Sequence, residues 1–226
     1  MPPKVIIAII TEGRSDMALQ ACVSILHLQM QLMTTQDGFQ ADMRFFKTNN
    51  EAITELYKSK EFEGIFMLNF ASGVPGEFAL KALRSDKDVV LGIHPLATID
   101  WDRVKEKIAS TTETLQNTGV VYNLKLASIP DAAGFAKVAD VQHADVMYVK
   151  RAAIDDIVER HPSAVSNDKK HTTILQEGIY DGVFMTAEQR FAHLYGKPIY
   201  ADTALQCSKA GPADYVGIVG NRSQIR

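Results

Sequence analysis

The sequence predicts an α/β fold in which a mainly parallel central sheet is flanked by helices. Residues 5–10 form a continuous apolar and largely β-branched run, which is typical of a strand covered on both faces. Further strands are predicted at 41–46, 64–68 and 89–92, and a segment with helical character separates each strand from the next. Three consecutive strand–helix–strand units favour parallel strands joined by right-handed crossovers.

Helices are predicted between these strands. In 16–33, apolar residues recur at steps of three and four, and we expect this stripe to face the core: Leu19, Val23, Leu26, Met30 and Met33. A capping box of Thr48 and Glu51 begins a second helix, which runs to about Lys58. A short third helix is predicted at 76–83.

The second half of the chain is less regular, and we expect a smaller antiparallel element there. Helices are predicted at 101–110, 151–160 and 186–195, and the predicted strands are 120–127, 147–149 and 198–200. The polar segment 163–171 is predicted to be a loop. No linker and no internal repeat interrupts the sequence, so we predict a single domain.

Composition narrows the classes of function. With 46% hydrophobic and 23% charged residues, the chain is typical of a soluble globular protein. Lys and Arg number 24 against 27 Asp and Glu, and this formal net charge of -3 gives no indication of a nucleic-acid binder. The two cysteines, Cys22 and Cys207, cannot form a disulfide framework. No apolar run approaches the length of a membrane span, and we expect no signal peptide, because the apolar run 5–10 is short and β-branched. We therefore expect a cytoplasmic protein.

General catalytic and binding motifs are missing from the sequence. It contains no phosphate-binding loop, no G-x-G-x-x-G, no cysteine and histidine spacing that suits zinc, and no G-x-S-x-G. His143 and Asp145 lie close together, but a metal site would need a third ligand that the sequence does not identify. We therefore interpret this pair as the polar edge of a strand rather than as a site.

The order of the elements nevertheless predicts where a ligand would bind. In parallel α/β sheets, ligands lie beyond the carboxyl ends of the strands. The segments that follow the four predicted strands are Thr11–Arg14, Lys47–Asn50, Asn69–Ser72 and His94–Asp100. We expect these four segments to surround one cleft.

A series of segments along residues 5–217 carries a resemblance to a known family. In chain order they are Thr48–Ile53, Phe66–Ala71, Gly92–Trp101, Met147–Arg151, Asp181–Phe191, Gly196–Asp202 and Lys209–Gly211. Their order resembles that of a GT-A type glycosyltransferase, which has the nucleotide-diphospho-sugar transferase fold. It is most similar to the compact members found in large DNA viruses and phages, which would place a viral protein in the host cytoplasm.

The resemblance implies one GT-A-like, Rossmann-like domain over 1–226, with two halves that bind different substrates. About 1–100 would be the nucleotide-binding half, about 101–217 the acceptor-side half, and 218–226 a tail. The partners it implies are a nucleotide-diphospho-sugar as substrate and a glycan or a protein as acceptor, with no nucleic acid. It says nothing about the oligomeric state.

The metal motif of the family is degenerate in this chain. In the family, the third strand ends in Asp-x-Asp, and carboxylates hold Mg²⁺ or Mn²⁺ against the diphosphate. Here the two acidic positions hold Asn69 and Ala71, the family's Glu-Asp pair is Ala187–Glu188, and Lys209 stands where the closing His belongs. The resemblance therefore implies that metal-dependent transfer is weak or absent, and we assign neither a metal ligand nor a cofactor.

Three hypotheses remain open at this stage. The chain is an active transferase that has lost its metal, a degenerate transferase that binds a nucleotide-sugar without turnover, or an inactive scaffold or interaction subunit that retains the fold. In the first, Lys209, Arg14 or Lys47 supplies positive charge to the departing diphosphate, and Glu188 is the base. An acid in the first turn of a helix, such as Glu188, also has a purely structural explanation. The residues expected to bind the nucleotide-sugar are Thr11, Glu12, Arg14, Asn50, Asn69 and Ser72.

Overall fold

A computed structural model describes residues 3–34, 38–107, 118–168, 171–205, 207–210 and 215–216. The tail predicted at 218–226 and residues 108–110 of a predicted helix lie outside this part of the chain. The α-helices are α1 (Leu19–Thr34), α2 (Asn49–Lys58), α3 (Glu77–Arg84), α4 (Trp101–Lys107), α6 (Arg151–Arg160) and α7 (Ala187–Tyr195). A single 3-10 turn, η1 (Pro162–Ala164), follows α6.

The centre of the fold is an eight-stranded sheet with the strand order β2-β1-β3-β10-β5-β15-β9-β8. In chain order its strands are β1 (Lys4–Ile10), β2 (Gln40–Phe46), β3 (Phe62–Asn69), β5 (Val89–Gly92), β8 (Leu124–Leu126), β9 (Phe135–Val141), β10 (Val146–Lys150) and β15 (Tyr200–Asp202). The predicted strands of the first half all form, with ends shifted by a few residues. The strand β9 was not predicted, because its polar residues Lys137 and Asp140 are three positions apart and do not give the alternation of a half-buried strand.

The prediction of a mainly parallel sheet is wrong, because the sheet is mixed. β1 pairs in parallel with β2 and β3, and β15 pairs in parallel with β5. The other four pairings are antiparallel: β10 with β3, β10 with β5, β9 with β15, and β8 with β9. The strand β10 lies between β3 and β5 and separates the strands that the sequence suggested were parallel neighbours. The fold is still α/β.

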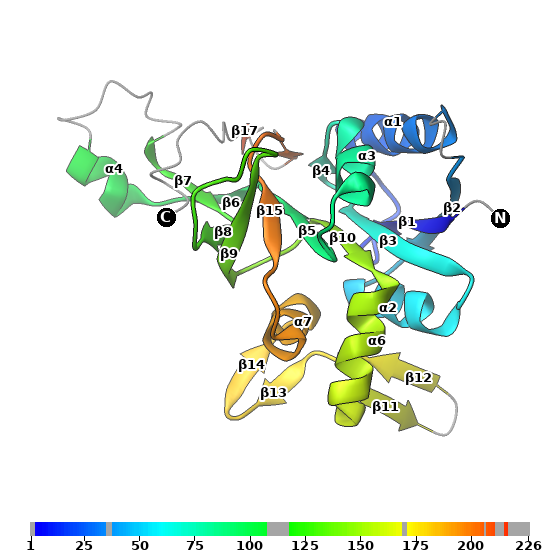
Figure 1. Ribbon diagram of the computed structural model, residues 1–226. Helices are drawn as coiled ribbons and strands as arrows, with labels where there is room; N and C mark the ends of the chain where they lie inside the picture. The colour runs from blue at the N-terminus through cyan, green and yellow to red at the C-terminus, as the bar shows by residue number, and fades with distance from the viewer. Residues whose placement is uncertain are drawn as a thin grey trace.

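Helices cover both faces of this sheet (Figure 1). On one face, Ile7 of β1 belongs to a buried cluster with Leu28 of α1 and Phe78 of α3. On the other face, Ile6 belongs to a cluster that includes Ile154 of α6, together with residues of α2 and α7. Because consecutive residues of β1 point to opposite faces, the continuous apolar run fills two cores.

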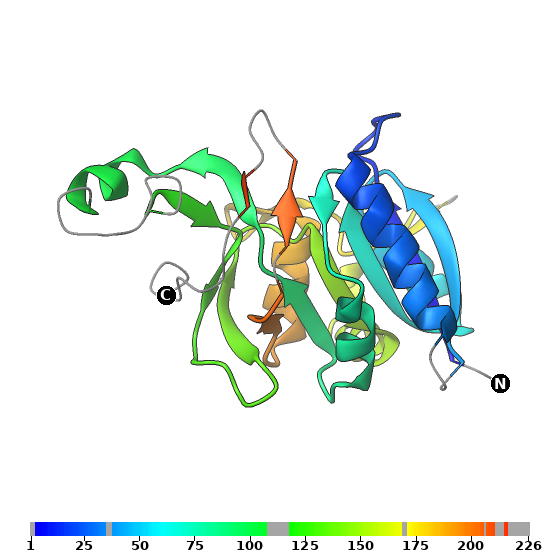
Figure 2. The same ribbon diagram turned by 90° about the horizontal axis from the view of Figure 1, so that it is seen from above.

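Short strands outside the central sheet complete the fold. Two antiparallel pairs are β11 (Val165–Asp168) with β12 (His171–Ile174) and β13 (Gly178–Tyr180) with β14 (Val183–Met185). A third pair is β6 (Pro95–Ile99) with β7 (Val120–Tyr122). A small three-stranded sheet consists of β17 (Tyr215–Val216), β16 (Ser208–Lys209) and β4 (Ser72–Gly73). The loop predicted at 163–171 is thus wrong, since this range includes all of β11 and the last two residues of η1. Seen from above, the β6–β7 pair and α4 project from one side of the molecule (Figure 2).

The orientation predicted for the first helix is also wrong. The apolar stripe expected in the core is exposed, and we call it the outer stripe: Leu19, Val23, Leu26, Met30 and Met33. The buried face of α1 consists instead of Ala21, Ser24, Ile25, Leu28 and Leu32. Within the described residues, no helix is long and apolar enough to cross a membrane.

Candidate functional site

The ends of three neighbouring strands meet at one edge of the central sheet. The backbone N–H of Thr11, after β1, donates to the carbonyl of Phe46 at the end of β2 over 2.8 Å. The N–H of Phe70, after β3, donates to the carbonyl of Ile10 at the end of β1 over 2.9 Å. The segments that follow β1, β2 and β3 therefore lie side by side, as their parallel pairing predicts.

Glu12 is held in a left-handed backbone conformation at this edge. Its φ is 52°, and Gly13 follows at 78°. Residues other than glycine rarely adopt such values, and they cluster at sites where the surrounding structure holds them. The carboxylate of Glu12 accepts a hydrogen bond from Nδ2 of Asn69 over 2.6 Å. The Arg14 guanidinium stacks over the Phe70 ring, 4.9 Å from its centroid.

Asn69 is buried and uses both ends of its side chain within the protein. Its Nδ2 donates to Glu12, and its Oδ1 accepts from the N–H of Ala71 over 3.0 Å. Its own backbone N–H donates to the carbonyl of Asp145 over 2.7 Å. The turn at Asn69 thus joins the end of β3 to the residue that precedes β10.

Asp145 is the centre of the charged cluster at this edge, and it is almost fully buried. Its Oδ2 lies 2.7 Å from Nζ of Lys209 and accepts a hydrogen bond from Oγ of Ser72 over 3.1 Å. Its Oδ1 lies 2.7 Å from Nε2 of His143, at the distance of an ion pair but without normal hydrogen-bond geometry. Nδ1 of His94 lies 3.6 Å from Oδ2. One carboxylate therefore holds together segments from distant parts of the sequence.

The protonation states of this cluster follow from its surroundings. Burial alone would raise the pKa of Asp145, but the interaction with His143 and the charge on Lys209 outweigh it and hold that pKa below its usual range. The contact with Asp145 in turn raises the pKa of His143, even though burial opposes this. Asp145 is therefore ionised at neutral pH, in spite of its burial.

His94 is the neutral member of the cluster. Burial lowers its pKa to about 4. Its Nε2 accepts the backbone N–H of Asp145 over 3.3 Å, so the ring proton resides on Nδ1, which lies 3.2 Å from the carbonyl oxygen of Pro95. His94 thus fixes the backbone of Asp145 and adds no charge at neutral pH.

Lys209 reaches Asp145 because β16 pairs with β4. Lys209 lies opposite Ser72 in this antiparallel pairing, and the N–H of Ala210 donates to the carbonyl of Ala71 over 2.7 Å. Two of the positions at which the chain departs from the family pattern, 71 and 209, are therefore near neighbours in space.

The remaining two predicted site residues, Asn50 and Glu188, lie around a small cavity of about 250 Å³. Glu188, in the first turn of α7, is buried and accepts a hydrogen bond from Nδ2 of Asn49 in α2. Nδ2 of Asn50 donates to the carbonyl of Ile174.

The residues at the degenerate acidic positions do not fit a divalent cation. The amide oxygen of Asn69 is already engaged, and Ala71 has no ligand atom. The ammonium of Lys209 occupies the neighbourhood of the one buried carboxylate, and its positive charge opposes a second cation. Among the described residues, no group of three or more histidine, cysteine, aspartate or glutamate side chains could hold a metal ion.

Sequence reasoning missed the residue at the centre of this edge. The interpretation of His143 and Asp145 as an ordinary polar strand edge is inadequate, because Asp145 is buried and paired with residues from three other segments. Their spacing of two residues was visible in the sequence. What could not be seen is that β10 runs antiparallel, so that its beginning lies at the carboxyl edge of β3 and β5.

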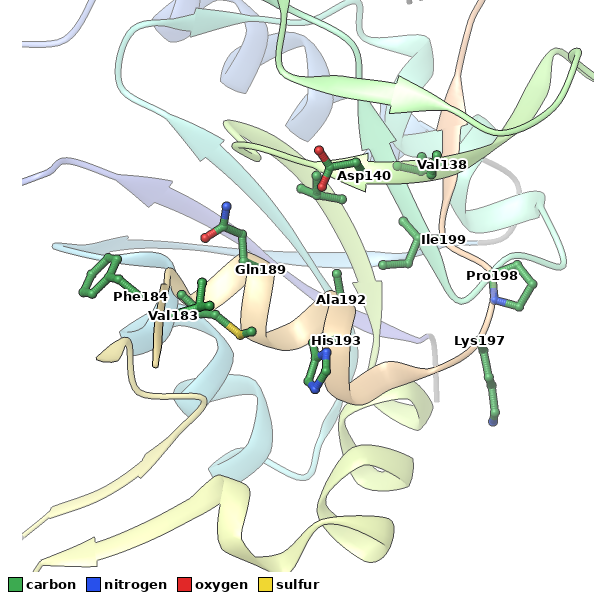
Figure 3. A pocket seen from close by; sticks show the side chains of 13 residues that line it. Val138, Asp140, Val183, Phe184, Gln189, Ala192, His193, Lys197, Pro198 and Ile199 are labelled. Atoms are coloured by element: carbon green, nitrogen blue, oxygen red, sulfur yellow. The ribbon is translucent and has the colours of Figure 1, made fainter. Parts of the chain in front are cut away.

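A larger cavity of about 460 Å³ lies elsewhere, between β9, β14 and α7 (Figure 3). The side chains of Phe184, Gln189 and Asp140 line it, and so does His193. None of the predicted site residues lines this cavity. It belongs to the part of the chain expected to form the acceptor side.

Comparisons with known proteins give only distant likenesses. No family model matches the chain, and no curated protein matches it. A crystal structure of A197 from STIV is similar over 92% of this chain and 86% of that chain, with 11% identity and a TM-score of 0.43. A crystal structure of HddC from Yersinia pseudotuberculosis is similar over 67% of this chain and 79% of that chain, with 10% identity and a TM-score of 0.32. At these scores the likenesses carry no argument about function.

Proposed function

We propose that this chain is a glycosyltransferase-like protein that binds a nucleotide-diphospho-sugar at the carboxyl edge of its sheet without a metal ion. The proposal rests on the resemblance in sequence and on one observation in the structure. Lys209 lies opposite Ser72, directly beside the turn where the family pattern has its acidic motif, and presents its ammonium group there. A fixed positive charge is what a diphosphate needs when no metal is bound.

The side chains of this edge divide into two roles in the proposal. Lys209 has three N–H donors, of which the contact with Asp145 uses one, so two remain for phosphate oxygens. Arg14 and Lys47 are exposed on the segments that follow β1 and β2, and they would add positive charge at the same edge of the sheet. The polar residues of the turns, Glu12 and Asn69, would face the base or the ribose.

Transfer of the sugar would need a base for the acceptor hydroxyl. Glu188 is the buried one of the two carboxylates that line the small cavity, and it lies between the start of α7 and the start of α2. It would take the hydroxyl proton while the diphosphate departs toward Lys209. This assignment makes Glu188 the residue whose removal stops turnover while binding persists.

Isothermal titration calorimetry tests the binding. Wild-type protein is titrated with UDP-glucose and GDP-mannose, in EDTA and in Mn²⁺. We expect binding of at least one of the two in EDTA, with no gain in Mn²⁺. Lys209→Met removes a charge-assisted contact and should weaken that binding about 10- to 100-fold. Lys125→Met, which removes an exposed lysine elsewhere, is the matched control and should bind normally.

A second variant tests the metal argument. The double substitution Asn69→Asp with Ala71→Asp restores the acidic motif, and we expect it to acquire a Mn²⁺-dependent gain in affinity. Stronger binding to the wild type in Mn²⁺ than in EDTA would contradict the proposal. So would equal affinity of wild type and Lys209→Met.

The scaffold hypothesis is the alternative, and one observation favours it. Asn69 is engaged by Glu12, and Lys209 by Asp145, so the polar groups of this edge already satisfy one another. If neither nucleotide-sugar binds at millimolar concentration, these contacts are structural, and the chain retains the fold without the ligand.

A further inference from the structure

The outer stripe of α1 is an unusual surface for a helix at the outside of a molecule. Leu19, Leu26 and Met33 are 80%, 63% and 68% exposed, and Val23 and Met30 lie between them. These positions are spaced by alternating steps of four and three residues, which is the period of the seam in helices that pack side chains into one another. The stripe points away from the sheet, because Ala21, Ile25, Leu28 and Leu32 already fill the opposite face.

The helix that carries the stripe has no charged residue. None of the 16 residues of α1 is Asp, Glu, Lys or Arg, although such residues make up 23% of the chain. Solvent-exposed helices usually carry charges on their outer face. A helix that is apolar on two opposite sides and uncharged throughout is typical of one that is covered on both sides.

Further exposed apolar side chains lie on the neighbouring edge of the sheet. β2 is an outermost strand of the eight-stranded sheet, and its Met43 and Phe45 are exposed on the face that α1 covers. With the outer stripe, seven large apolar side chains are each two fifths or more exposed. Together these side chains present on the order of 800 Å², most of it on the outer stripe, which is comparable with the share of one partner in a standard protein–protein interface.

We propose that this chain forms a two-fold symmetric dimer in which the outer stripe of α1 packs against the same stripe of a second copy. A seam with the coiled-coil period is complementary to itself, and a two-fold interface needs the same surface on both partners. Because α1 has no Asp, Glu, Lys or Arg, its outer stripe cannot attract a charged partner by electrostatic complementarity. For the same reason, the α1 helices of two copies can approach each other without charge repulsion. Membrane-surface helices, by contrast, are typically rich in Lys and Arg on their polar face.

The two-fold symmetry predicts that the middle residue of the outer stripe lies at the centre of the dimer interface. Leu26 is the middle of the five positions of the stripe. In a two-fold packing of the stripe on itself, the axis passes near the middle, so Leu26 lies against Leu26 of the partner copy. Residues at the centre of an interface dominate its affinity.

Sedimentation-velocity and light-scattering measurements over a range of concentrations test the dimer. We expect wild-type protein to have twice the monomer mass of 25.0 kDa. The variant Leu26→Lys with Met30→Lys should raise the dimer dissociation constant by at least about 30-fold, with an unchanged circular dichroism spectrum. Ile129→Lys, which charges an equally exposed apolar residue far along the chain, should remain dimeric.

Cross-linking tests the geometry independently. Leu26→Cys in a Cys22→Ser background should form an intermolecular disulfide on mild oxidation, because the two sulfur atoms would meet at the axis. Ile129→Cys in the same background should not. A monomeric wild type at 100 µM overturns the proposal, and the same protein is then tested on vesicles of phosphatidylcholine and phosphatidylserine. A dimer that persists in Leu26→Lys with Met30→Lys, or fails to cross-link at position 26, also overturns it.

Discussion

The stability of this protein should fall as the solution becomes mildly acidic, because His94 cannot take up a proton in the folded state. Burial lowers the pKa of His94 to about 4, from an ordinary value of 6.5. Below pH 6.5 the unfolded chain binds a proton at this position, whereas the folded protein does so only below about pH 4. The free energy of unfolding therefore decreases as pH falls through this window.

The size of this effect follows from the two pKa values. The full difference between 6.5 and about 4 corresponds to roughly 3 kcal/mol, of which about 2 kcal/mol is lost between pH 7 and pH 5. His143 acts in the opposite direction. Its pKa is raised, so its contribution is present below 6.5 and is lost as pH rises. A comparison that keeps His143 in both proteins isolates the contribution of His94.

Urea unfolding of wild type and His94→Gln at pH 7 and pH 5 makes that comparison. Gln does not titrate, and its side-chain oxygen can accept the N–H of Asp145 in place of Nε2. The wild type should lose about 2 kcal/mol more than His94→Gln between the two pH values. His193→Gln, at an exposed histidine, should behave like the wild type. An equal loss in wild type and His94→Gln would refute the argument that burial keeps His94 neutral.

Three further substitutions test the packing around the site by urea unfolding at pH 7. Asp145→Asn leaves Lys209 without its buried partner and should cost about 3–5 kcal/mol; a loss below 1 kcal/mol would show that the carboxylate is not central. Gly92→Ala places a Cβ 2.8 Å from that of Val146 and should cost about 1–3 kcal/mol by overpacking, whereas an unchanged midpoint would mean that β10 shifts freely. Thr186→Ala removes the side-chain cap of α7 and should cost about 1 kcal/mol, and Thr186→Ser, which keeps the hydroxyl, should recover most of it.

Local patterns predicted the elements of this fold better than their arrangement. The helix at 151–160 was predicted with its observed bounds, and the capping box predicted for Thr48 and Glu51 is present in part. The Thr48 side chain accepts from the N–H of Glu51, but the Glu51 carboxylate accepts from the N–H of Lys47 instead of that of Thr48. Capping contacts of this kind join residues only three or four positions apart in the chain, so they can be predicted from the local sequence.

Strand direction was not available from the sequence in the same way. The segment Val146–Val149 is apolar because it is central and covered on both faces. A central antiparallel strand and a central parallel strand produce the same run of apolar residues. The antiparallel direction of β10, and with it the mixed sheet, depends on contacts with residues more than 50 positions away.

The buried face of the first helix could not be predicted from the sequence either. α1 has two apolar stripes, and the one with the larger side chains was predicted to face the core. The sheet instead packs against the stripe that contains Ala21, whose small side chain is fully buried. Size and spacing alone could not identify which stripe is buried inside the domain.

The position of β10 has a consequence for the order in which the fold can form. β3 and β5 are complete once residue 92 has been synthesised, but the strand that joins them begins only at Val146. Until then β3 has an unpaired apolar edge and β5 has no neighbouring strand on either side, since β15 begins only at Tyr200. Asn69 also lacks the carbonyl to which its N–H donates. Edges of this kind promote aggregation, and contacts between distant residues slow folding. Because Lys209 also belongs to the charged cluster, the polar edge of the site can assemble only when nearly the whole chain has left the ribosome.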